Sequence, residues 1–502
     1  MKMKKANWII FGVITVFYIA AMAMPFINIF CVSMPDFLPI AVALVLLMFI
    51  IVGWKNGKAK TAVRIVNVCI GIFAIMICLA GEYLNPWWNS ISEHPNSYTF
   101  LNYNEKISGK DAIADIDYAM KYVRKIHPLC YKGMPDGVEK QYQDVVDYLK
   151  GKDEVEVAEV QAELQSILSQ FHDGHTSAAI WNDDSYLYLN EWYKHEIAGD
   201  QIIAINGIGV DNIYDEKLNL YSADSKEYGY ARFCNDVTDL SALTMLGYNA
   251  DDGITYTFLK PSGEKTDETY YTKDYVTYDQ YCRYNNLDET EESDEEDPFV
   301  YYTIDTDRSL ATLTLNSCNY NQEYRNCLKS MFTEIQDKNI QNVAVDLRNN
   351  GGGASAVVNE FIRYLNVDTY RGMGSKVRYG CFYVNANEGI CKNKKYNDLT
   401  FKGNVYVLTS VYTYSSAMDF AMYIKDNNMG KIIGQASGNN PSSYGDISQI
   451  YLKNSGLVMS VSIKKWYRID PQKDGELIEP DFECSPGDEF EKLYSIIDTK
   501  KQ

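Results

Sequence analysis

The chain has 502 residues and a formal net charge of −20, so it is too long for one ordinary domain, and about three units are expected. The charge is uneven, because residues 1–84 hold seven Lys or Arg and two acids (+5) and the remainder carries −25. So acidic a remainder argues against a nucleic-acid partner, since phosphate binding needs clustered Lys and Arg.

Three apolar runs open the chain: Trp8–Phe30, Phe37–Trp54 and 62–80. Each is about as long as a helix that crosses a ~30 Å hydrocarbon core, which predicts a three-helix membrane anchor over residues 1–84. A cleaved signal peptide is the alternative, but two further apolar runs behind the first disfavour it.

The distribution of basic residues predicts how this anchor is oriented. Lys and Arg lie in Met1–Lys5 and Trp54–Arg64, whereas the short connection Cys31–Asp36 has none. The positive-inside rule then places the N-terminus in the cytoplasm and everything after about Gly81 outside. The expected location is therefore the cell membrane, multi-pass, with an extracytoplasmic remainder.

Residues 85–108 are interpreted as a juxtamembrane linker, followed by a small helical subdomain over 109–184. In this subdomain apolar residues recur at three- and four-residue spacing, first over Ala114–Val123 and again over Val155–Ile167. The second helix leads into Phe171-His172-Asp173-Gly174-His175-Thr176, where a histidine lies among small turn-forming residues. A lone histidine is usually structural, so this segment needs support from the rest of the chain.

Residues 185–285 are expected to be rich in β-strands. In Gly199–Gly207 alternating isoleucines precede Asn-Gly, which is a hairpin signal, and the stretch resembles the strand-and-turn core of PDZ domains. The region is therefore interpreted as a PDZ-like insert. The acidic run Asp288–Asp297 holds eight acids in ten residues and predicts a solvated linker over 286–298.

The eleven cysteines give no disulfide framework and no CxxC or Cys/His zinc spacing. If a disulfide forms, Cys381 and Cys391 are the first pair to consider. No metal site and no organic cofactor is indicated.

After Pro298 strands and helices alternate, which predicts an α/β core over 299–490. Four strands are expected, at Ser309–Leu315, Val343–Leu347, Val405–Leu408 and Leu457–Ile463. Three helices are expected, at Glu323–Gln336, Ala354–Leu365 and Ser416–Asp426.

Two segments of this core have the residue types of an acyl-transfer site. The strand Val343–Arg348 runs into Asn-Asn-Gly-Gly-Gly, and glycines at a strand exit let backbone N–H groups approach an anion. A phosphate site is disfavoured, because the loop lacks the Lys-Ser/Thr ending of a P-loop. Ser416 lies where a strand turns into a helix, and the next amide, that of Ala417, can face an oxyanion. Alone, such a serine would more often cap the helix.

In this order and spacing, the histidine, glycine and serine segments resemble those of the C-terminal-processing and tricorn-type serine peptidases. The resemblance implies an α/β (crotonase-like) peptidase core. The family motif DLRNNPGG matches Asp346–Gly353, so Gly352 takes the place of the oxyanion-donor glycine and Gly351 replaces the proline. The family nucleophile lies three residues before an acid, which selects Ser416 against Asp419 and leaves Ser415 as the alternative.

The resemblance also indicates which base and acid to expect. In the Ser/Lys branch a lysine follows the nucleophile by 25 residues, but Pro441 holds that position here. The tricorn-type branch uses a histidine, which selects His175, with His172 as a neighbour; an imidazole pKa near ~6.5 suits a general base. The orienting carboxylate is expected to be Glu476, with Asp474 and Glu479 as alternatives.

The function implied is that of a membrane-anchored, extracytoplasmic serine endopeptidase that cleaves peptides or proteins through an acyl-enzyme. His175 would deprotonate Ser416, the Gly352 and Ala417 amides would bind the oxyanion, and Glu476 would orient the imidazole. The alternative is a catalytically silent peptide-binding or sensor protein on the same fold.

Overall fold

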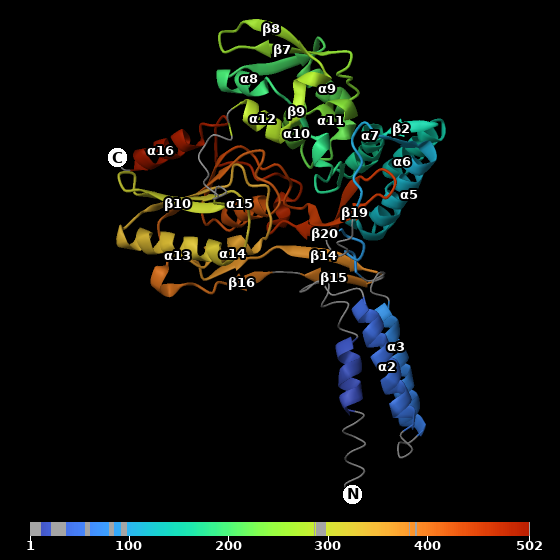
Figure 1. Ribbon diagram of the computed structural model, residues 1–502. Helices are drawn as coiled ribbons and strands as arrows, with labels where there is room; N and C mark the ends of the chain where they lie inside the picture. Colours follow the sequence, from blue (N-terminus) through green and yellow to red (C-terminus); the bar gives the residue numbers. More distant parts are fainter. Residues whose placement is uncertain are drawn as a thin grey trace.

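The computed structural model describes residues 12–21, 37–55, 61–79, 85–91, 98–285, 287, 298–380, 382–386 and 389–500. Most of these residues form a mixed α/β body, and the N-terminal helices project from one side of it (Figure 1). Three predictions fall outside the described residues: the basic segment Met1–Lys5, the acidic run Asp288–Asp297, and Cys381 of the expected disulfide.

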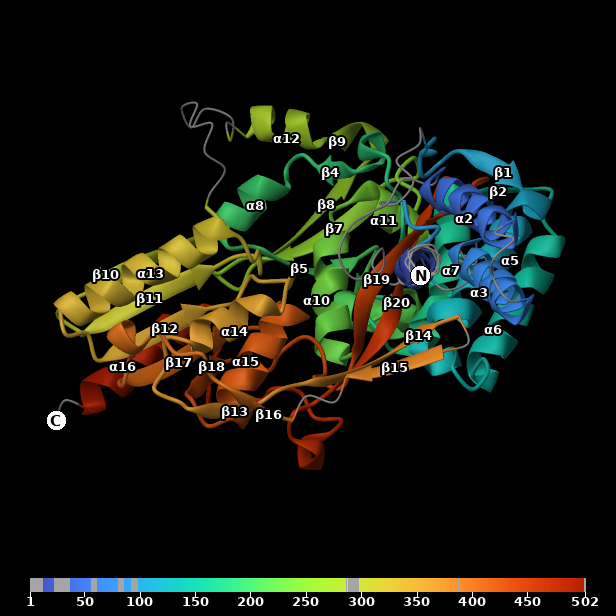
Figure 2. The same ribbon diagram turned by 90° about the horizontal axis from the view of Figure 1, so that it is seen from below.

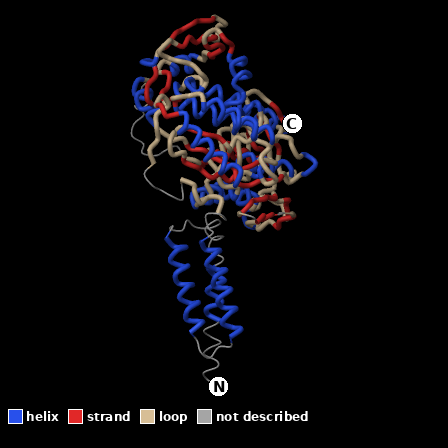
Figure 3. The backbone as a smooth tube through the Cα atoms, turned by 90° about the vertical axis from the view of Figure 1, so that its right-hand side faces the viewer, coloured by secondary structure: helices blue, strands red, loops and turns tan. Residues whose placement is uncertain are grey.

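The N-terminal helices are residues 12–21, α2 (Phe37–Lys55) and α3 (Thr61–Leu79). They pack against one another through a small apolar cluster that includes Tyr18, Leu46 and Ala74. Figure 3 shows them as a group of helices that extends away from the body.

The prediction of a three-span anchor, and with it the multi-pass membrane location, is contradicted. In the described part of the chain, no helix combines the length and the apolar character needed to cross a membrane. The α2 and α3 helices have 19 residues each.

Three amphipathic helices follow: α5 (Gly109–Ile126), α6 (Asp136–Lys150) and α7 (Val157–Leu168). Apolar spacing predicted α5 and α7, and both are confirmed as helices. The α5 helix begins at Ser108, whose side-chain oxygen accepts the N–H of Asp111. The short strands β1 (Lys106–Ser108) and β2 (Glu154–Glu156) pair antiparallel and join the starts of α5 and α7.

The next region contains a four-stranded antiparallel sheet in the order β6-β5-β7-β8. The predicted hairpin is confirmed: β5 (Gln201–Ile205) and β6 (Ile208–Gly209) meet at Asn206 and Gly207, with φ of 48° and 75°. Positive φ at both positions is what a two-residue type I′ turn requires. Figure 1 shows β7 and β8 at the end of the body opposite the N-terminal helices. The other elements of this region are β7 (Ile254–Leu259), β8 (Lys265–Tyr270), β4 (Leu187–Leu189), β9 (Tyr275–Thr277), α8 (Trp192–Ala198), α9 (Val210–Lys217), α10 (Lys226–Asp236), α11 (Leu240–Met245) and α12 (Tyr278–Tyr284).

A six-stranded sheet in the order β10-β11-β12-β17-β18-β21 forms the centre of the α/β core. Its strands from β11 to β21 are parallel, and β10 is antiparallel at one edge. The elements are β10 (Val300–Asp305), β11 (Leu310–Leu315), β12 (Asn342–Asp346), β17 (Asn404–Thr409), β18 (Lys431–Gly434), β21 (Phe482–Glu483), α13 (Gln322–Asp337), α14 (Ala356–Ile362), α15 (Ser416–Asp426) and α16 (Glu489–Lys500).

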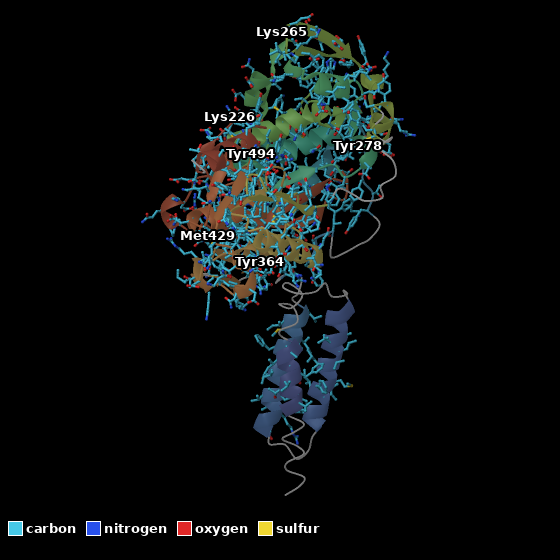
Figure 4. All side chains as sticks on the ribbon, turned by 90° about the vertical axis from the view of Figure 1, so that its left-hand side faces the viewer. Lys226, Lys265, Tyr278, Tyr364, Met429 and Tyr494 are labelled. Carbon is cyan, nitrogen blue, oxygen red and sulfur yellow. The ribbon has the colours of Figure 1, made fainter. Side chains whose placement is uncertain are left out.

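Helices cover both faces of this sheet (Figure 2). Val343 and Val345 of β12 face the layer of α13, α14 and α15, while Ala344 faces the layer that contains α16. Burial on both faces explains why β12 is continuously apolar. Side chains fill the space between the layers, among them Tyr364, which Figure 4 labels and which stacks on Phe332 with ring centroids 4.4 Å apart.

The predicted strands and helices of the core agree closely with these bounds, with two differences. The α14 helix begins later than expected, because Gly353 bridges to Cys318 and the Ala354 amide donates to Cys318 O. The predicted strand Leu457–Ile463 is real, but it lies in β20 (Val458–Tyr467), which belongs to a second sheet.

This second, antiparallel sheet has the order β15-β14-β20-β19, and β3 also pairs with β20. Its pairing of Ser177 with Ser460 joins the histidine segment to the C-terminal part of the chain. Figure 2 shows β19 and β20 running between the α5–α7 helices and the six-stranded sheet. The elements are β3 (Ser177–Ala179), β14 (Gly374–Tyr379), β15 (Phe382–Ala386) and β19 (Tyr444–Tyr451), with β13 (Thr369–Arg371) and β16 (Ile390–Lys392) as a separate pair.

Candidate active site

The serine segment lies beyond the carboxyl end of β17, where the chain turns into α15. Ser416 is the first residue of α15 and is 5% exposed. Ser415 before it has φ 53° and ψ −125°, a conformation that is costly for a residue with a Cβ. Its N–H donates to Asn439 Oδ1 at 2.8 Å, which helps to hold the strained turn. Ser416 is thereby presented at the start of a helix and at the end of a strand.

The glycine-rich loop leaves β12 and packs directly against this serine turn. The buried Asn350 holds the loop: its Nδ2 donates to Leu315 O at 2.7 Å, and its Oδ1 accepts the Gly352 N–H at 2.8 Å. Gly352 has φ 112°, and a Cβ there would lie 2.7 Å from Ser415 Cβ and 3.0 Å from Ser416 N. Only glycine permits this approach, because any side chain would collide with the turn that carries Ser416.

We therefore expect Gly352→Ala to lower peptidase activity about a hundredfold, since even a small displacement of a reacting group is costly. The strain at positive φ should also cost about 1–3 kcal/mol of folding free energy. Peptide cleavage and thermal melting would measure the two effects. Gly137→Ala on α6 is the control, because a Cβ there meets nothing within 4 Å and Gly137 does not line the pocket. Equal losses in both variants would contradict the assigned role of Gly352.

His175 lies in the turn that precedes β3, next to a fully buried carboxylate. Asp173 Oδ1 accepts the backbone N–H of His175 at 3.0 Å and lies 3.5 Å from its Nδ1. Asp173 Oδ2 accepts the Thr176 hydroxyl at 2.7 Å and lies 3.3 Å from Nε2 of the buried His127. The imidazole of His175 is therefore backed by a carboxylate that other groups hold in place.

The charges around this turn set the pKa of each member. Burial alone would lower the pKa of His175, but the hydrogen bond and charge of Asp173, with the charges of Asp224 and Asp419, raise it above its ordinary value. Burial would raise the pKa of Asp173, but hydrogen bonds from His127 and His175 hold it below its usual range. The pair is thus an ionised carboxylate beside a more basic imidazole, which suits a general base.

A second buried carboxylate, Asp224, completes this polar group. Its Oδ2 accepts the Tyr414 hydroxyl at 2.5 Å and the Gly174 N–H at 3.1 Å. The same Tyr414 hydroxyl lies 3.5 Å from His175 Nδ1. Burial, reinforced by the nearby charge of Asp173, raises the pKa of Asp224 to about 7. Tyr414 and Asp224 therefore form the wall beside the His175 ring.

Ser416 and His175 line the same pocket, which has a volume of about 300 Å³. Met418, Ile447 and Trp466 give part of its wall an apolar character, and no lysine of the described chain lines it. No hydrogen bond joins Ser416 to His175 in the part of the chain that the structure describes. Instead the Ser416 hydroxyl is within hydrogen-bond distance of Gly353 O, at 2.8 Å. Within those residues, no group of three or more His, Cys, Asp or Glu side chains is placed to hold a metal ion.

Both backbone amides that were expected to bind an oxyanion already donate hydrogen bonds within the protein. The Gly352 N–H donates to Asn350 Oδ1 at 2.8 Å, and the Ala417 N–H donates to Tyr414 O at 3.1 Å. The pocket is lined instead by Gly351 and Gly353. Within the described residues, the amides of these two glycines have no hydrogen-bond acceptor. The backbone N–H groups of this loop that remain free to donate are therefore those of the residues on either side of Gly352.

Glu476 lies away from the pocket, contrary to its expected role beside the imidazole. Its side chain is exposed, as are those of the alternatives Asp474 and Glu479, and none of the three lines the pocket. The segment is held through its backbone: Arg468 Nη1 donates to Glu476 O at 2.9 Å, and its Nε donates to Asp426 at 2.8 Å. The family resemblance selected this loop, but the carboxylate beside His175 is that of Asp173.

Sequence reasoning missed several polar residues of the site. Asp173 had a local signal, because it lies two residues before His175 in the same short turn. His127, Asp224 and Ser355 had none, since only tertiary contacts bring these segments to the pocket.

Comparisons with known proteins found one family and several similar folds. Residues 309–484 match the family described as Peptidase family S41. Mature CPAF complexed with lactacystin aligns with a TM-score of 0.53 at 12% identity, over 78% of this chain and 98% of that chain. A serine-to-alanine mutant of CPAF gives 0.56 at 12% identity, over 78% and 96%. The photosystem II D1 C-terminal processing protease gives 0.41 at 14% identity, over 77% and 97%. No curated protein gives a significant sequence match.

The matched residues include the glycine-rich loop, Ser416 and most of the six-stranded sheet, whereas His175 lies before them. The likeness to CPAF, at 12% identity, is one of fold and extends over almost all of its chain. Residues 309–484 are therefore similar to the domain of Peptidase family S41, which supports a peptidase.

Proposed function

We propose that the chain hydrolyses peptide bonds in peptides or proteins through an acyl-enzyme, with Ser416 as nucleophile and His175 as general base. The observation that carries the proposal is the shared pocket of about 300 Å³, lined by Ser416 and His175, with the buried Asp173 behind the imidazole. No metal or organic cofactor takes part in the proposed steps.

In the first step Ser416 Oγ attacks the carbonyl carbon of the substrate while its proton moves to His175. In the resting structure the Ser416 hydroxyl donates to Gly353 O, so this hydrogen bond must be given up before the proton can pass to the imidazole. The imidazolium then gives the proton to the leaving amine. Water completes the hydrolysis by the same route, with His175 again as base.

The oxyanion is proposed to bind to the glycine-rich loop. The free amides of Gly351 and Gly353 favour these residues as donors. Gly352 and Ala417, the donors expected from the sequence, would first have to release Asn350 Oδ1 and Tyr414 O. Preorganised donors of this kind typically contribute about 3–4 kcal/mol to transition-state stabilisation.

Asp173 is proposed as the carboxylate that orients and charges the imidazole, in place of Glu476. It is buried, it stays ionised, and it lies 3.5 Å from His175 Nδ1. An ionised carboxylate in this position favours the imidazolium that forms during the reaction.

A fluorophosphonate probe tests the proposal directly, because it forms a covalent bond only with an activated serine. The full chain should take up one probe per molecule, and mapping of the labelled peptides should place it on Ser416. Labelling confined to other serines, or none in a protein that is folded by circular dichroism, would refute the assignment of the nucleophile.

A further inference from the structure

Two side chains that the proposed mechanism does not use form a hydrogen-bonded chain with the nucleophile. Ser355 lies immediately before α14, and its Oγ is 2.9 Å from Ser416 Oγ. The same Ser355 Oγ is 3.0 Å from Asp419 Oδ2, and Asp419 lies one helical turn after Ser416 on α15. The far end of the chain is Gly353 O, 2.8 Å from Ser416 Oγ.

This chain is shielded from bulk water but open to the pocket. Asp419 is 6% exposed and Ser416 is 5% exposed, and both line the pocket together with Ser355. A buried hydroxyl or carboxyl without a partner is costly, so each member depends on its neighbours for its hydrogen bonds.

Counting the protons shows that the chain can run in two directions, because each serine hydroxyl has a single hydrogen to donate. When Asp419 is ionised it can only accept, so Ser355 donates its one hydrogen to Asp419 and has none left for Ser416, whose own hydroxyl donates to Gly353 O. When Asp419 is protonated it can donate to Ser355 Oγ, Ser355 donates to Ser416 Oγ, and Ser416 donates to Gly353 O. The protonation of Asp419 thus decides whether Ser355 can donate a hydrogen bond to Ser416 Oγ.

Only the second direction helps the attack by Ser416. A donor aimed at Oγ stabilises the negative charge that develops there as the proton leaves for His175. In the first direction the Ser355 hydrogen points to Asp419, so the charge that develops on Ser416 Oγ lacks this donor.

We propose that Ser355 is a further catalytic residue, which donates to Ser416 Oγ when Asp419 is protonated, and that Asp419 is a positioning residue that sets this direction. The inference rests on the proposed function, since it assumes Ser416 as nucleophile and His175 as base. No atom is gained or lost in the switch apart from the one proton that Asp419 exchanges with water.

The surroundings of Asp419 place this switch near neutral pH. Burial raises the pKa of Asp419 to about 7, and the charge of Asp446 on β19 adds to the rise, while Ser355 and His175 act in the opposite direction. Asp446 is itself paired with Lys464 of β20. The thiol of the buried Cys318 also lies close enough for Asp419 to raise its pKa. Both forms of Asp419 are therefore populated in the range where a peptidase of this kind is assayed.

The experiment measures the rate at which the fluorophosphonate modifies Ser416 in the full chain, from about pH 5 to about pH 10. The wild-type rate should rise with pH as His175 loses its proton and fall again as Asp419 ionises. Asp419→Asn should remove the alkaline fall, because its side-chain amide always donates to Ser355. Asp446→Asn should move the fall to lower pH, because the charge that raises the pKa of Asp419 is gone.

Ser355→Ala should lower the maximum rate roughly tenfold to a hundredfold, as expected for loss of a hydrogen bond to a charged group, and should also remove the alkaline fall. Ser355→Thr keeps the hydroxyl and should restore both. Ser495→Ala, on α16 with its hydroxyl bonded to Lys492 O, is the matched control and should behave as wild type.

The outcomes separate this inference from the proposed function. A wild-type protein without label on Ser416 would refute the proposed function itself. A labelled wild type with an unchanged rate in Ser355→Ala, or with the alkaline fall retained in Asp419→Asn, would overturn the role of Ser355 and Asp419 alone. Thermal melting at about pH 8 serves as the control for misfolding of Asp419→Asn. Because the substitution removes a buried charge, this variant should melt no lower than wild type.

Discussion

Replacing Ser416 by alanine should abolish peptide-bond cleavage and leave the fold intact. The side chain supplies the attacking oxygen, and loss of a nucleophile of this type typically costs on the order of 10⁶ in turnover. Among the described residues its hydroxyl has two hydrogen-bond partners, Ser355 Oγ and Gly353 O, so we expect its removal to leave the elements around it packed as before. Cleavage of a fluorescence-quenched peptide library, with circular dichroism as the measure of folding, checks both parts.

Ser415→Ala is the matched control for this variant. Ser415 is held through its backbone N–H, by Asn439 Oδ1, and alanine keeps that bond and the same Cβ. We expect its turnover to stay within about tenfold of wild type, because no reacting atom is removed. Cleavage that survives in Ser416→Ala but is lost in Ser415→Ala would move the nucleophile by one residue.

The second large effect is expected at His175. As general base it must be neutral, so activity should fall as the pH drops through its pKa. Because the charges of Asp173, Asp224 and Asp419 raise that pKa, the acid limb should lie above the ordinary imidazole value of ~6.5. His175→Ala should be nearly inactive, and Asp173→Asn should lose about 10³–10⁴ in turnover, as does a triad whose imidazole is wrongly oriented. A profile of kcat/KM against pH measures the position of this acid limb.

Two sets of variants test the choice of this base. His172 is exposed and has φ 49°, so His172→Asn, which tolerates this backbone, should remain active. Replacement of the lysines by methionine, singly at Lys425, Lys431, Lys464 and Lys465, should cost far less than His175→Ala. An active His175→Ala together with an inactive lysine variant would restore a Ser/Lys mechanism and exclude the one proposed here.

The sequence by itself determined the local structure of this protein and the chemistry of three segments. The strands and helices of the core, the Asn206-Gly207 hairpin and the start of α15 at Ser416 follow from apolar periodicity and turn chemistry, which act over a few residues. The glycine at position 352 could likewise be interpreted from the sequence, because a strand end that closely approaches another turn needs a residue without a Cβ.

The apolar runs of the N-terminus show where such local reading fails. Hydropathy predicted three membrane spans, and α2 and α3 begin and end within one residue of the predicted runs 37–54 and 62–80. The described helices α2 and α3 are 19 residues long, and no described helix meets the requirements of a span.

Only the tertiary structure decided which groups meet in the active site. The pairing of β3 with β20 joins Ser177 to Ser460 and so brings His175 to the pocket of Ser416. The same packing buries Asp173 beside the imidazole, leaves Glu476 exposed, and places Ser355 between Ser416 and Asp419. These are contacts between segments far apart in the chain. Which hydrogen bonds a buried polar group makes, and hence its pKa, depends on partners that no local pattern encodes.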